Sequence, residues 1–418
     1  MATNKGWTTR KLGDLAEFRN GVNYNKSSFG EGMKVVGVSD FQDYTKPKYA
    51  ELDQINPEGI VTERNILHDG DIVFVRSNGN RELIGRSLFI QQPPEEVTHS
   101  AFTIRLRFTS REVNPMFFAY CFRTPLIRKG LTAHGGGTNI SNLNQDILGA
   151  LEVPFPPLPV QRRIAEILSA YDELMENSQR RIQILEEMTR ALYRKWFVHF
   201  RFPGHDKIKR IDSRLGSIPN DWEVVSFTDI ADVLSGGTPK TEVPGYWDGE
   251  IPFFTPRDVP ACFYVRETEK HVTEQGLSKC ASELYPPDTV FITARGTVGK
   301  VVLPSVPMAM NQSCYALRGK AGIPQRFLFL MTLQQVGYLK TNTGGATFGT
   351  IVVDTFRRMQ VVKPPSDLIV RFAHQIDANF EQINNLERQS ANLRRTRDLL
   401  LPRLLSGQVE IPNMTEPR

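Results

Sequence analysis

The sequence predicts an α+β protein in which a mixed α/β domain occurs twice and each copy is followed by a long helix. Three observations carry this prediction: an internal repeat, short strand-like runs in both copies, and two segments with heptad periodicity. We expect the two tandem domains to be related by a pseudo-two-fold axis. We expect the two long helices to separate them and to pair as an antiparallel coiled coil.

The repeat begins with WTTRKLGDLAEFRNG at residues 7–21 and WEVVSFTDIADVLSG at residues 222–236. The two stretches align without a gap at an offset of 215 residues, which places Trp7 on Trp222 and Gly21 on Gly236. Their shared residues are a Trp, an Asp-Leu/Ile-Ala-acid run and a Gly. We interpret these as positions that maintain the fold.

Three further blocks match in the same order along the chain. They are GDIVFVRSNG (70–79) with PDTVFITARG (287–296), HGGGTNIS (134–141) with TGGATFGT (343–350), and LEVPFPP (151–157) with MQVVKPP (359–365). The first of these blocks places Asp71 on Asp288 and Phe74 on Phe291. Because four blocks keep one order and the unit is about half of the chain, we interpret the pattern as a duplicated domain and not as a solenoid.

Short elements are predicted inside both copies. The runs DIVFVRS and DTVFITA are rich in β-branched and aromatic residues and end at Gly-containing turns, which is typical of strands. The segments NPMFFAYCFRTPLIRKGL (114–131) and IPQRFLFLMTLQQVGYL (323–339) have a Pro near their start and are predicted to form helices.

Two long segments differ from the domains in their sequence pattern, because their apolar residues recur at alternating steps of four and three. The first seam contains Ile164, Leu168, Tyr171, Met175, Ile182, Leu185, Leu192 and Trp196, with Ser178 and Thr189 at two further positions. The second, at an offset of 208 residues, contains Phe372, Ile376, Ile383, Leu386, Leu393, Leu400 and Leu404. Asn379 and Arg397 interrupt it. They either fix the register at some cost in stability, or mark a drift of the seam toward solvent.

These elements give the following predicted organisation. Residues 1–157 form the first domain, 158–198 the first long helix and 199–217 a linker. Residues 218–365 form the second domain, 366–407 the second long helix and 408–418 a tail. A helix of about 36 residues would be roughly 54 Å long.

Composition limits the classes of protein that the chain can represent. The hydrophobic fraction of 40% and the charged fraction of 23% are typical of a globular protein. The sequence has no run of 18 apolar residues and no signal-peptide pattern, so we predict a cytoplasmic protein without a membrane partner. The net charge of +5 is compatible with nucleic-acid binding without proving it.

No catalytic or metal-binding motif is complete, so we predict no catalytic residue and no metal ligand. The stretch ARGTVGKV (294–301) lacks the first Gly and the Ser/Thr of a phosphate-binding loop. No dinucleotide fingerprint and no Asn/Asp-Pro-Pro-aromatic tetrapeptide of amino-methyltransferases occurs. The four cysteines lack C-x-x-C spacing, and the seven histidines are scattered.

The remaining candidates are loop residues with polar or positively charged side chains. Arg and Asn can form paired hydrogen bonds with guanine and adenine, and Lys, Thr and backbone amides suit phosphates. Such residues also simply form turns, which is the more frequent case for any one of them. The candidates are Asn20, Tyr24, Lys26, Arg76, Asn78, Asn80, Arg81, Arg86, Thr138 and Asn139 in the first domain, and Lys240, Thr241, Arg257, Arg295, Thr297, Lys300, Thr343 and Thr347 in the second.

Several stretches resemble the specificity subunit of Type I restriction-modification systems. They are RDLLLPRLLSGQVEI (397–411), ALYRKWFVHFRFPG (191–204), PPLPVQRRIAEIL (156–168), LGSIPNDWEVV (215–225) and SGGTPKTEVPGYWDGEIPFFTPRDV (235–259). The last resembles the opening of a target-recognition domain. The first domain departs from it with NGVNYNKSSFG, so we expect the two domains to read different DNA sequences.

The resemblance implies a non-catalytic subunit that binds double-stranded DNA. Each domain would read one half of a bipartite, asymmetric target, and the helices would act as a spacer and dock two methyltransferase subunits. Those partners would use S-adenosylmethionine to methylate a flipped-out adenine. Restriction/translocase subunits would use ATP and magnesium. No cofactor is expected in this chain.

Two other classes remain open on the sequence alone. One is a coiled-coil protein adaptor with no intrinsic DNA recognition, which would show almost no salt-dependent DNA binding. The other is a self-sufficient methyltransferase or nuclease, which would transfer methyl groups to DNA or cleave it without a partner.

Overall fold

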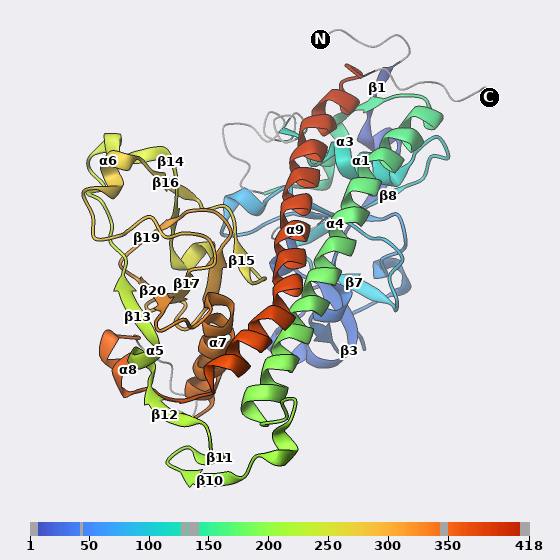
Figure 1. The fold of residues 1–418 in the computed structure, drawn as a ribbon. Helices are drawn as coiled ribbons and strands as arrows, with labels where there is room; N and C mark the ends of the chain where they lie inside the picture. Colours follow the sequence, from blue (N-terminus) through green and yellow to red (C-terminus); the bar gives the residue numbers. More distant parts are fainter. Residues whose placement is uncertain are drawn as a thin grey trace, which may run out of the picture. The chain divides into compact units, whose positions relative to one another are not determined.

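The computed structural model describes residues 7–41, 45–125, 127, 131, 142–342 and 350–409 (Figure 1). It divides into two compact units. Unit 1 comprises Met1–Leu174 and Asn392–Arg418, and unit 2 comprises Met175–Ala391. Each unit therefore contains one globular domain and a part of both long helices.

Unit 1 is built on two sheets. A four-stranded sheet has the order β2-β8-β5-β6, a three-stranded sheet has the order β4-β3-β7, and β1 pairs with β9. The strands are β1 Thr8–Lys11, β2 Ala16–Asn20, β3 Phe29–Val36, β4 Gln54–Ile55, β5 Ile72–Val75, β6 Ser87–Phe89, β7 Val97–His99, β8 Thr103–Phe108 and β9 Glu152–Phe155. The short helices are α1 Pro115–Cys121 and α3 Gln145–Ala150.

Unit 2 repeats this plan. A five-stranded sheet has the order β13-β20-β17-β18-β15, a three-stranded sheet has the order β16-β14-β19, and β12 pairs with β21. Its strands are β12 Glu223–Ser226, β13 Ala231–Ser235, β14 Trp247–Phe254, β15 Tyr264–Val265, β16 Lys270–Val272, β17 Val290–Thr293, β18 Val301–Pro304, β19 Ala309–Met310, β20 Cys314–Gly319 and β21 Gln360–Lys363. Its short helices are α5 Phe227–Ile230, α6 Glu274–Leu277, α7 Gln325–Asn342 and α8 Val353–Arg358.

The matching strand orders confirm the predicted duplication, but the strand pairing corrects one block of the sequence match. Ile72 in β5 lies opposite Leu106, and Val290 in β17 lies opposite the equivalent Leu317. Phe74 therefore corresponds to Ile292, and the match of Phe74 with Phe291, together with that of Asp71 with Asp288, is wrong by one residue. A shift of one residue moves a side chain to the other face of a sheet.

The core clusters show the consequence of that shift. Phe74 packs in the cluster that also holds residues of α1, α3 and α4, whereas Phe291 packs on the opposite face with Phe254, Tyr285 and Met310. Both faces of these strands are buried, so both faces are apolar. A run such as VFV or VFI therefore has no alternation of polar and apolar residues that would fix the alignment of the two copies.

The glycines that end the repeated opening have a shared structural reason. A Cβ atom at Gly21 would lie 2.1 Å from the carbonyl oxygen of His99, and one at Gly236 would lie 2.1 Å from that of Asn311. Only a residue without a side chain allows the strand end to approach the neighbouring segment this closely. Both glycines therefore let a strand end pack closely on a neighbouring segment, which contains His99 and Ser100 in unit 1 and Met310 and Asn311 in unit 2.

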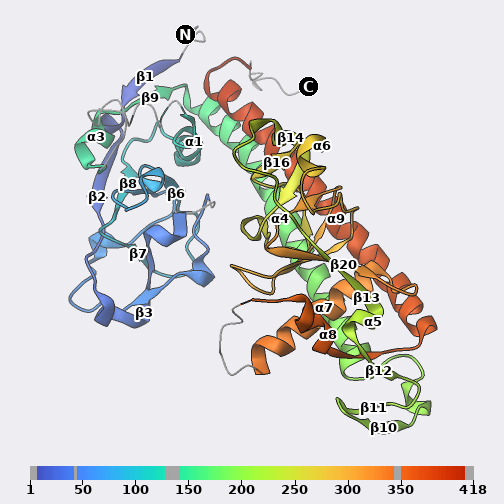
Figure 2. The ribbon, with the colours of Figure 1, turned by 90° about the vertical axis from the view of Figure 1, so that its left-hand side faces the viewer.

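The long helices are confirmed. Helix α4 spans Leu158–Tyr193 and continues as a π-helical turn, Arg194–Val198, while α9 spans Ser366–Leu405. Figures 1 and 2 show them side by side. They run antiparallel, because residue 172 of α4 contacts residue 397 of α9 in unit 1 and residue 189 contacts residue 379 in unit 2. None of the seam positions named above is fully exposed.

The two polar residues of the second seam make specific contacts. The Asn379 side-chain amide donates a hydrogen bond to the Thr189 hydroxyl (3.1 Å). Arg397 is only 9% exposed and donates to the carboxylate of Asp172, which also accepts a hydrogen bond from the Tyr120 hydroxyl (2.7 Å). The alternative that Arg397 marks a drift of the seam into solvent is therefore wrong.

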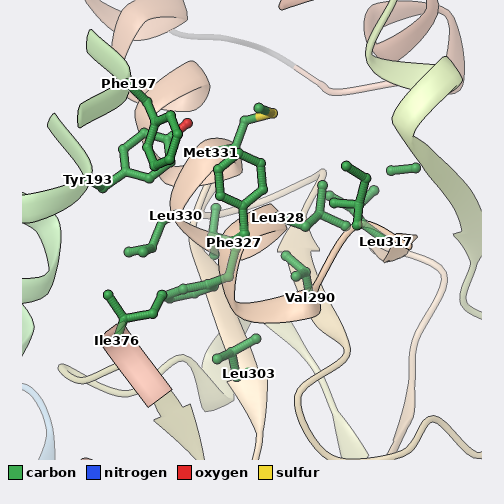
Figure 3. Packing of buried hydrophobic residues seen from close by; sticks show 14 of the residues in the cluster. Tyr193, Phe197, Val290, Leu303, Leu317, Phe327, Leu328, Leu330, Met331 and Ile376 are labelled. Carbon is green, nitrogen blue, oxygen red and sulfur yellow. The ribbon is translucent and has the colours of Figure 1, made fainter. Parts of the chain in front are cut away.

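The helices also belong to the cores of the domains. In unit 2, Tyr193 and Phe197 at the end of α4 pack with Phe327 of α7, with ring centroids 5.8 and 5.1 Å apart (Figure 3). Ile376 of α9 joins the same cluster. In unit 1, Ile164 and the end of α9 share a cluster with strands β5 and β8. Each domain is thus packed onto the parts of both helices that lie in its own unit.

The stretch between α4 and the second domain contains a β-hairpin. Strands β10 Arg210–Ser213 and β11 Gly216–Pro219 pair antiparallel. Trp222, the residue that opens the second copy, stacks on Phe202 at 5.4 Å between ring centroids. Its indole is buried, as the prediction of a fold-maintaining role for this position requires.

A buried carboxyl group connects α4 to the second domain. Glu186 accepts hydrogen bonds from the Phe263 amide (2.5 Å) and from Arg190 (3.1 Å), whose guanidinium lies 4.6 Å from the centre of the Phe263 ring. Burial raises the pKa of Glu186 to about 7; the bonds from Phe263 and Arg190 oppose this shift, and the nearby carboxylate of Glu387 adds to it.

This raised pKa predicts a pH-dependent stability. Because the fold favours protonated Glu186, the contribution of this group is fully present below about pH 4.5 and is lost as the pH rises through about 7. The Glu186→Gln side chain stays neutral over this pH range. We therefore expect the free energy of unfolding of this variant, relative to that of the wild type, to increase by roughly 2 to 3 kcal/mol from pH 5 to pH 8. Urea unfolding at both pH values measures this difference. The exposed neighbour Glu187→Gln is the control and should follow the wild type. Equal pH profiles for all three proteins would contradict the assignment.

Candidate nucleic-acid interface

Four segments of unit 2 meet at one edge of the domain. Gly237 donates its amide to Met310, Asn311 donates to Phe254, and Ala294 donates to Ser313, at 3.1, 3.0 and 2.7 Å. These bonds bring together residues 236–238, 254–258, 294–300 and 311–313. All four segments lie at the end of a strand, and two of them, 254–258 and 294–300, carry residues that the sequence selects as candidate DNA contacts.

This edge, called the loop edge of unit 2, carries exposed positive charge. Arg257, Arg295 and Lys300 are exposed, and no described residue forms an ion pair with any of them. The Thr297 hydroxyl donates to the Pro256 carbonyl (3.4 Å), which ties the loop of Arg295 and Lys300 to the loop of Arg257. Free guanidinium groups on a fixed frame are suited to guanine edges and phosphates.

Unit 1 contains the same frame. Val22 donates its amide to His99, Ser100 donates to Val36, and Arg76 donates to Phe102, at 2.8, 3.0 and 2.8 Å. The segments 21–24, 36–40, 76–86 and 100–102 therefore meet as their counterparts do in unit 2, and they form the loop edge of unit 1. A carboxylate fixes the same turn in both: Asp40 accepts from Gly37 (2.7 Å), and Asp258 accepts from Thr255 (2.8 Å).

The candidates of unit 1 are more closely tied into the fold than those of unit 2. Asn78 and Asn80 accept hydrogen bonds from the backbone two residues further on, which is the ordinary turn role that competes with base contact. Arg86 donates to the Phe41 carbonyl (3.4 Å), and Asn20 accepts from Gln145 (3.3 Å). Tyr24 packs edge-to-face on Phe29.

The remaining candidates fall into three groups. Lys26 and Arg81 lie in the short 3-10 helices Lys26–Ser28 and Arg81–Leu83, and Arg76 is half-buried. Lys240 and Thr241 are exposed beside Trp247, whose indole donates to the Lys240 carbonyl; no hydrogen bond joins them to the loop edge of unit 2 within the part of the chain that is described. Thr138, Asn139, Thr343 and Thr347 lie outside the described residues.

Sequence reasoning missed three residues of the two loop edges. Phe102 is exposed on the turn of unit 1, while Thr238 and Gln312 are exposed and hydrogen-bonded to each other in unit 2. An apolar residue between Ala and Thr gives no sign of exposure. The internal repeat is the signal that could have identified Phe102. Once the strands of the two copies are aligned, the turn that contains Phe102 matches residues 311–314.

Among the residues that the structure describes, no three His, Cys, Asp or Glu side chains gather in a way that would hold a metal ion. Within the same residues, none of the helices combines the length and the apolar composition that a membrane span needs.

The chain thus repeats one domain with equivalent but chemically different loop edges, and the class of protein in which such a pair of domains occurs follows from a family model. The family model described as Type I restriction modification DNA specificity domain matches residues 4–187 and 219–391. The chain belongs to this family, and both copies of the repeat are DNA-specificity domains.

Individual relatives agree with this assignment. The chain is 28% identical over 194 residues to the type I restriction enzyme MjaIX specificity subunit of Methanocaldococcus jannaschii, a match that covers 46% of this chain and 44% of that relative. It is 21% identical over 408 residues to the HindI specificity subunit of Haemophilus influenzae, covering 83% and 88% of the two chains. The crystal structure of a Type-I restriction-modification system S subunit from M. genitalium shares the fold, with a TM-score of 0.57, 17% identity and 99% of both chains covered.

Proposed function

We propose that this chain is the non-catalytic subunit that gives a Type I restriction-modification complex its DNA sequence specificity. Each domain reads one half of a bipartite, asymmetric target in double-stranded DNA through its loop edge. The observation that supports this most directly is that one backbone frame occurs twice with different side chains. A shared frame positions each domain on DNA in the same way, and the differing side chains select different bases.

The paired helices act as the spacer between the two half-sites. A helix such as α4, with 36 residues, is about 54 Å long, enough to span half-sites one turn of DNA apart, roughly 34 Å. The polar contacts of Arg397 and Asn379 are suited to keeping the two helices in a single register.

The helices also dock two methyltransferase subunits. Ile184 and Met188 on α4 are 51% and 56% exposed, lie one helical turn apart and point away from the seam. Exposed apolar side chains on a regular helix are suited to binding a partner protein. The methyltransferase subunits supply S-adenosylmethionine-dependent adenine methylation, and the restriction/translocase subunits supply ATP- and magnesium-dependent translocation and cleavage.

Exchange of one domain tests the modular reading of the target. We expect replacement of residues 1–157 by the equivalent domain of a relative with another specificity to change one half-site and leave the other half-site and the gap unchanged. Methylome sequencing of DNA from cells that express the complete system reads both half-sites at once.

The unmodified system, sequenced in parallel, is the control for this exchange. A change in both half-sites would show that the domains do not read independently. Methylation by the purified chain alone, without partner subunits, would contradict its non-catalytic role.

A further inference from the structure

The turn Ser100–Thr103 in unit 1 and the turn Asn311–Cys314 in unit 2 are built in the same way. In each, the side chain of the first residue accepts the amide of the third: Phe102 donates to the Ser100 hydroxyl (3.2 Å), and Ser313 donates to the Asn311 side-chain oxygen (3.0 Å). The amide of the fourth residue also bonds to the carbonyl of the first in both turns. Phe102 and Ser313 therefore occupy equivalent positions.

Both positions are also held from the outside. The Phe102 carbonyl accepts the amide of Arg76 (2.8 Å), and the Ser313 carbonyl accepts that of Ala294 (2.7 Å). The backbone on either side of Phe102 is thus fixed by the frame of the loop edge, and the direction in which the side chain leaves the domain is fixed with it. The two turns differ in the side chain that this shared frame presents.

That side chain is a phenyl ring facing solvent. Phe102 is 60% exposed, more than any other large hydrophobic residue among those described. The only other exposed phenylalanine of the described residues, Phe29, packs on Tyr24. Val22, which lies in the same loop-edge segment as Tyr24, pairs with Ser100 in an isolated β-bridge. Unit 1 therefore presents apolar aromatic surface at the loop edge, where unit 2 presents Arg257, Arg295 and Lys300.

We propose that Phe102 is a specificity-determining residue that packs against the 5-methyl group of a thymine in the half-site read by the first domain. This inference rests on the proposed function, in which the loop edge faces DNA. A phenyl ring has no donor or acceptor, and the thymine methyl is the one apolar group that base edges expose in the major groove. The first domain accordingly reads a thymine-containing half-site, whereas the cationic edge of the second favours guanine.

Duplexes in which single thymines are replaced test the inference. The probes carry the target found by methylome sequencing, with each thymine of one half-site replaced in turn by deoxyuridine, which lacks only the methyl group. Binding is measured with the assembled complex of this chain and its methyltransferase subunits. We expect one replacement to weaken wild-type binding by roughly three- to tenfold, because a methyl contact is lost. We expect Phe102→Ser to bind the thymine and deoxyuridine duplexes equally.

Ser is the substitute because it stands at the equivalent position of unit 2 and leaves the backbone bonds of the turn in place. Leu215→Ser, which removes an exposed apolar side chain from the β10–β11 hairpin, is the control and should keep the wild-type response to deoxyuridine. Circular dichroism of each variant establishes that the fold is retained.

The outcomes separate this inference from the proposed function. Failure of the wild-type complex to prefer the unmodified target would overturn the proposed function. Preference for the target without any effect of deoxyuridine would overturn only the inference, as would a half-site without thymine. Phe102→Ser could instead lose affinity by the same factor, relative to the wild type, on the thymine duplex and on the deoxyuridine duplex. That result would assign the ring to insertion between bases and would also reject the thymine contact.

Discussion

Arg397→Met should lower the free energy of unfolding by about 3 to 5 kcal/mol, the range for breaking a buried ion pair. The variant keeps the length of the side chain but removes its charge, so the buried Asp172 carboxylate on α4 keeps only the more distant Arg123, at 4.0 Å, as a cationic partner. The Tyr120 hydroxyl still donates to Asp172 and Arg123 stays near it, which places the expected loss toward the lower end of the range. Urea unfolding of the purified chain, followed by circular dichroism, measures it.

The ion pair Arg163–Glu166 on α4, the helix that carries Asp172, provides the matched control. It joins two exposed side chains three residues apart, with 3.3 Å between nitrogen and oxygen. Surface pairs of this kind contribute about 0 to 1 kcal/mol, so Arg163→Ala should be nearly neutral. If Arg397→Met were no more destabilising than Arg163→Ala, the buried network would not stabilise the junction of α1, α4 and α9. The double variant Arg397→Met, Asp172→Asn should recover part of the loss, since it removes the buried carboxylate that has lost its bond to Arg397.

The combined substitution Arg257→Ala, Arg295→Ala, Lys300→Ala should weaken specific DNA binding by the assembled complex at least about 100-fold. Two arginines that each contact a base or phosphate contribute about 1 to 3 kcal/mol apiece. Each lost phosphate contact should also lower the slope of log affinity against log salt by about one. Titration of a target duplex at several salt concentrations gives both numbers from one data set.

Three other exposed cations of unit 2 control for the change in net charge. Lys209, Arg214 and Lys279 lie on or beside the β10–β11 hairpin and α6, outside the loop edge. Their combined replacement by Ala removes the same charge and should change affinity by much less. Equal losses in the two triple variants would mean that general electrostatic attraction, and not the loop edge, accounts for binding.

The sequence alone predicts the architecture because the architecture depends on long patterns. Eight apolar residues at steps of four and three are enough to predict α4, and its observed start at Leu158 follows from the Pro-rich stretch that precedes it. The repeated opening around Trp7 and Trp222 predicts the duplication, because a shared fold needs the same buried residues and the same closely packed glycine in both copies.

Local chemistry was harder to predict, for two physical reasons. In strands that are buried on both faces, every residue is apolar, so the match of Phe74 with Phe291 could slip by one residue without any visible penalty. Likewise, Asn and Arg in loops look alike whether they form a turn, as Asn78 does, or face solvent, as Arg295 does. The difference depends on hydrogen bonds to segments far away in the chain.

Two copies of one domain, two long helices that need partners, and loops rich in residues that suit DNA are all predictable from the amino-acid sequence. Which of those loop residues stand together depends on the packing of segments that are far apart in the chain. Arg257 and Arg295 are 38 positions apart in the sequence, and they share one edge because Asn311 and Ser313 bond to the strand ends that carry them. Phe102 became a candidate in the same way, since exposure is a property of the packed chain and not of the residue type.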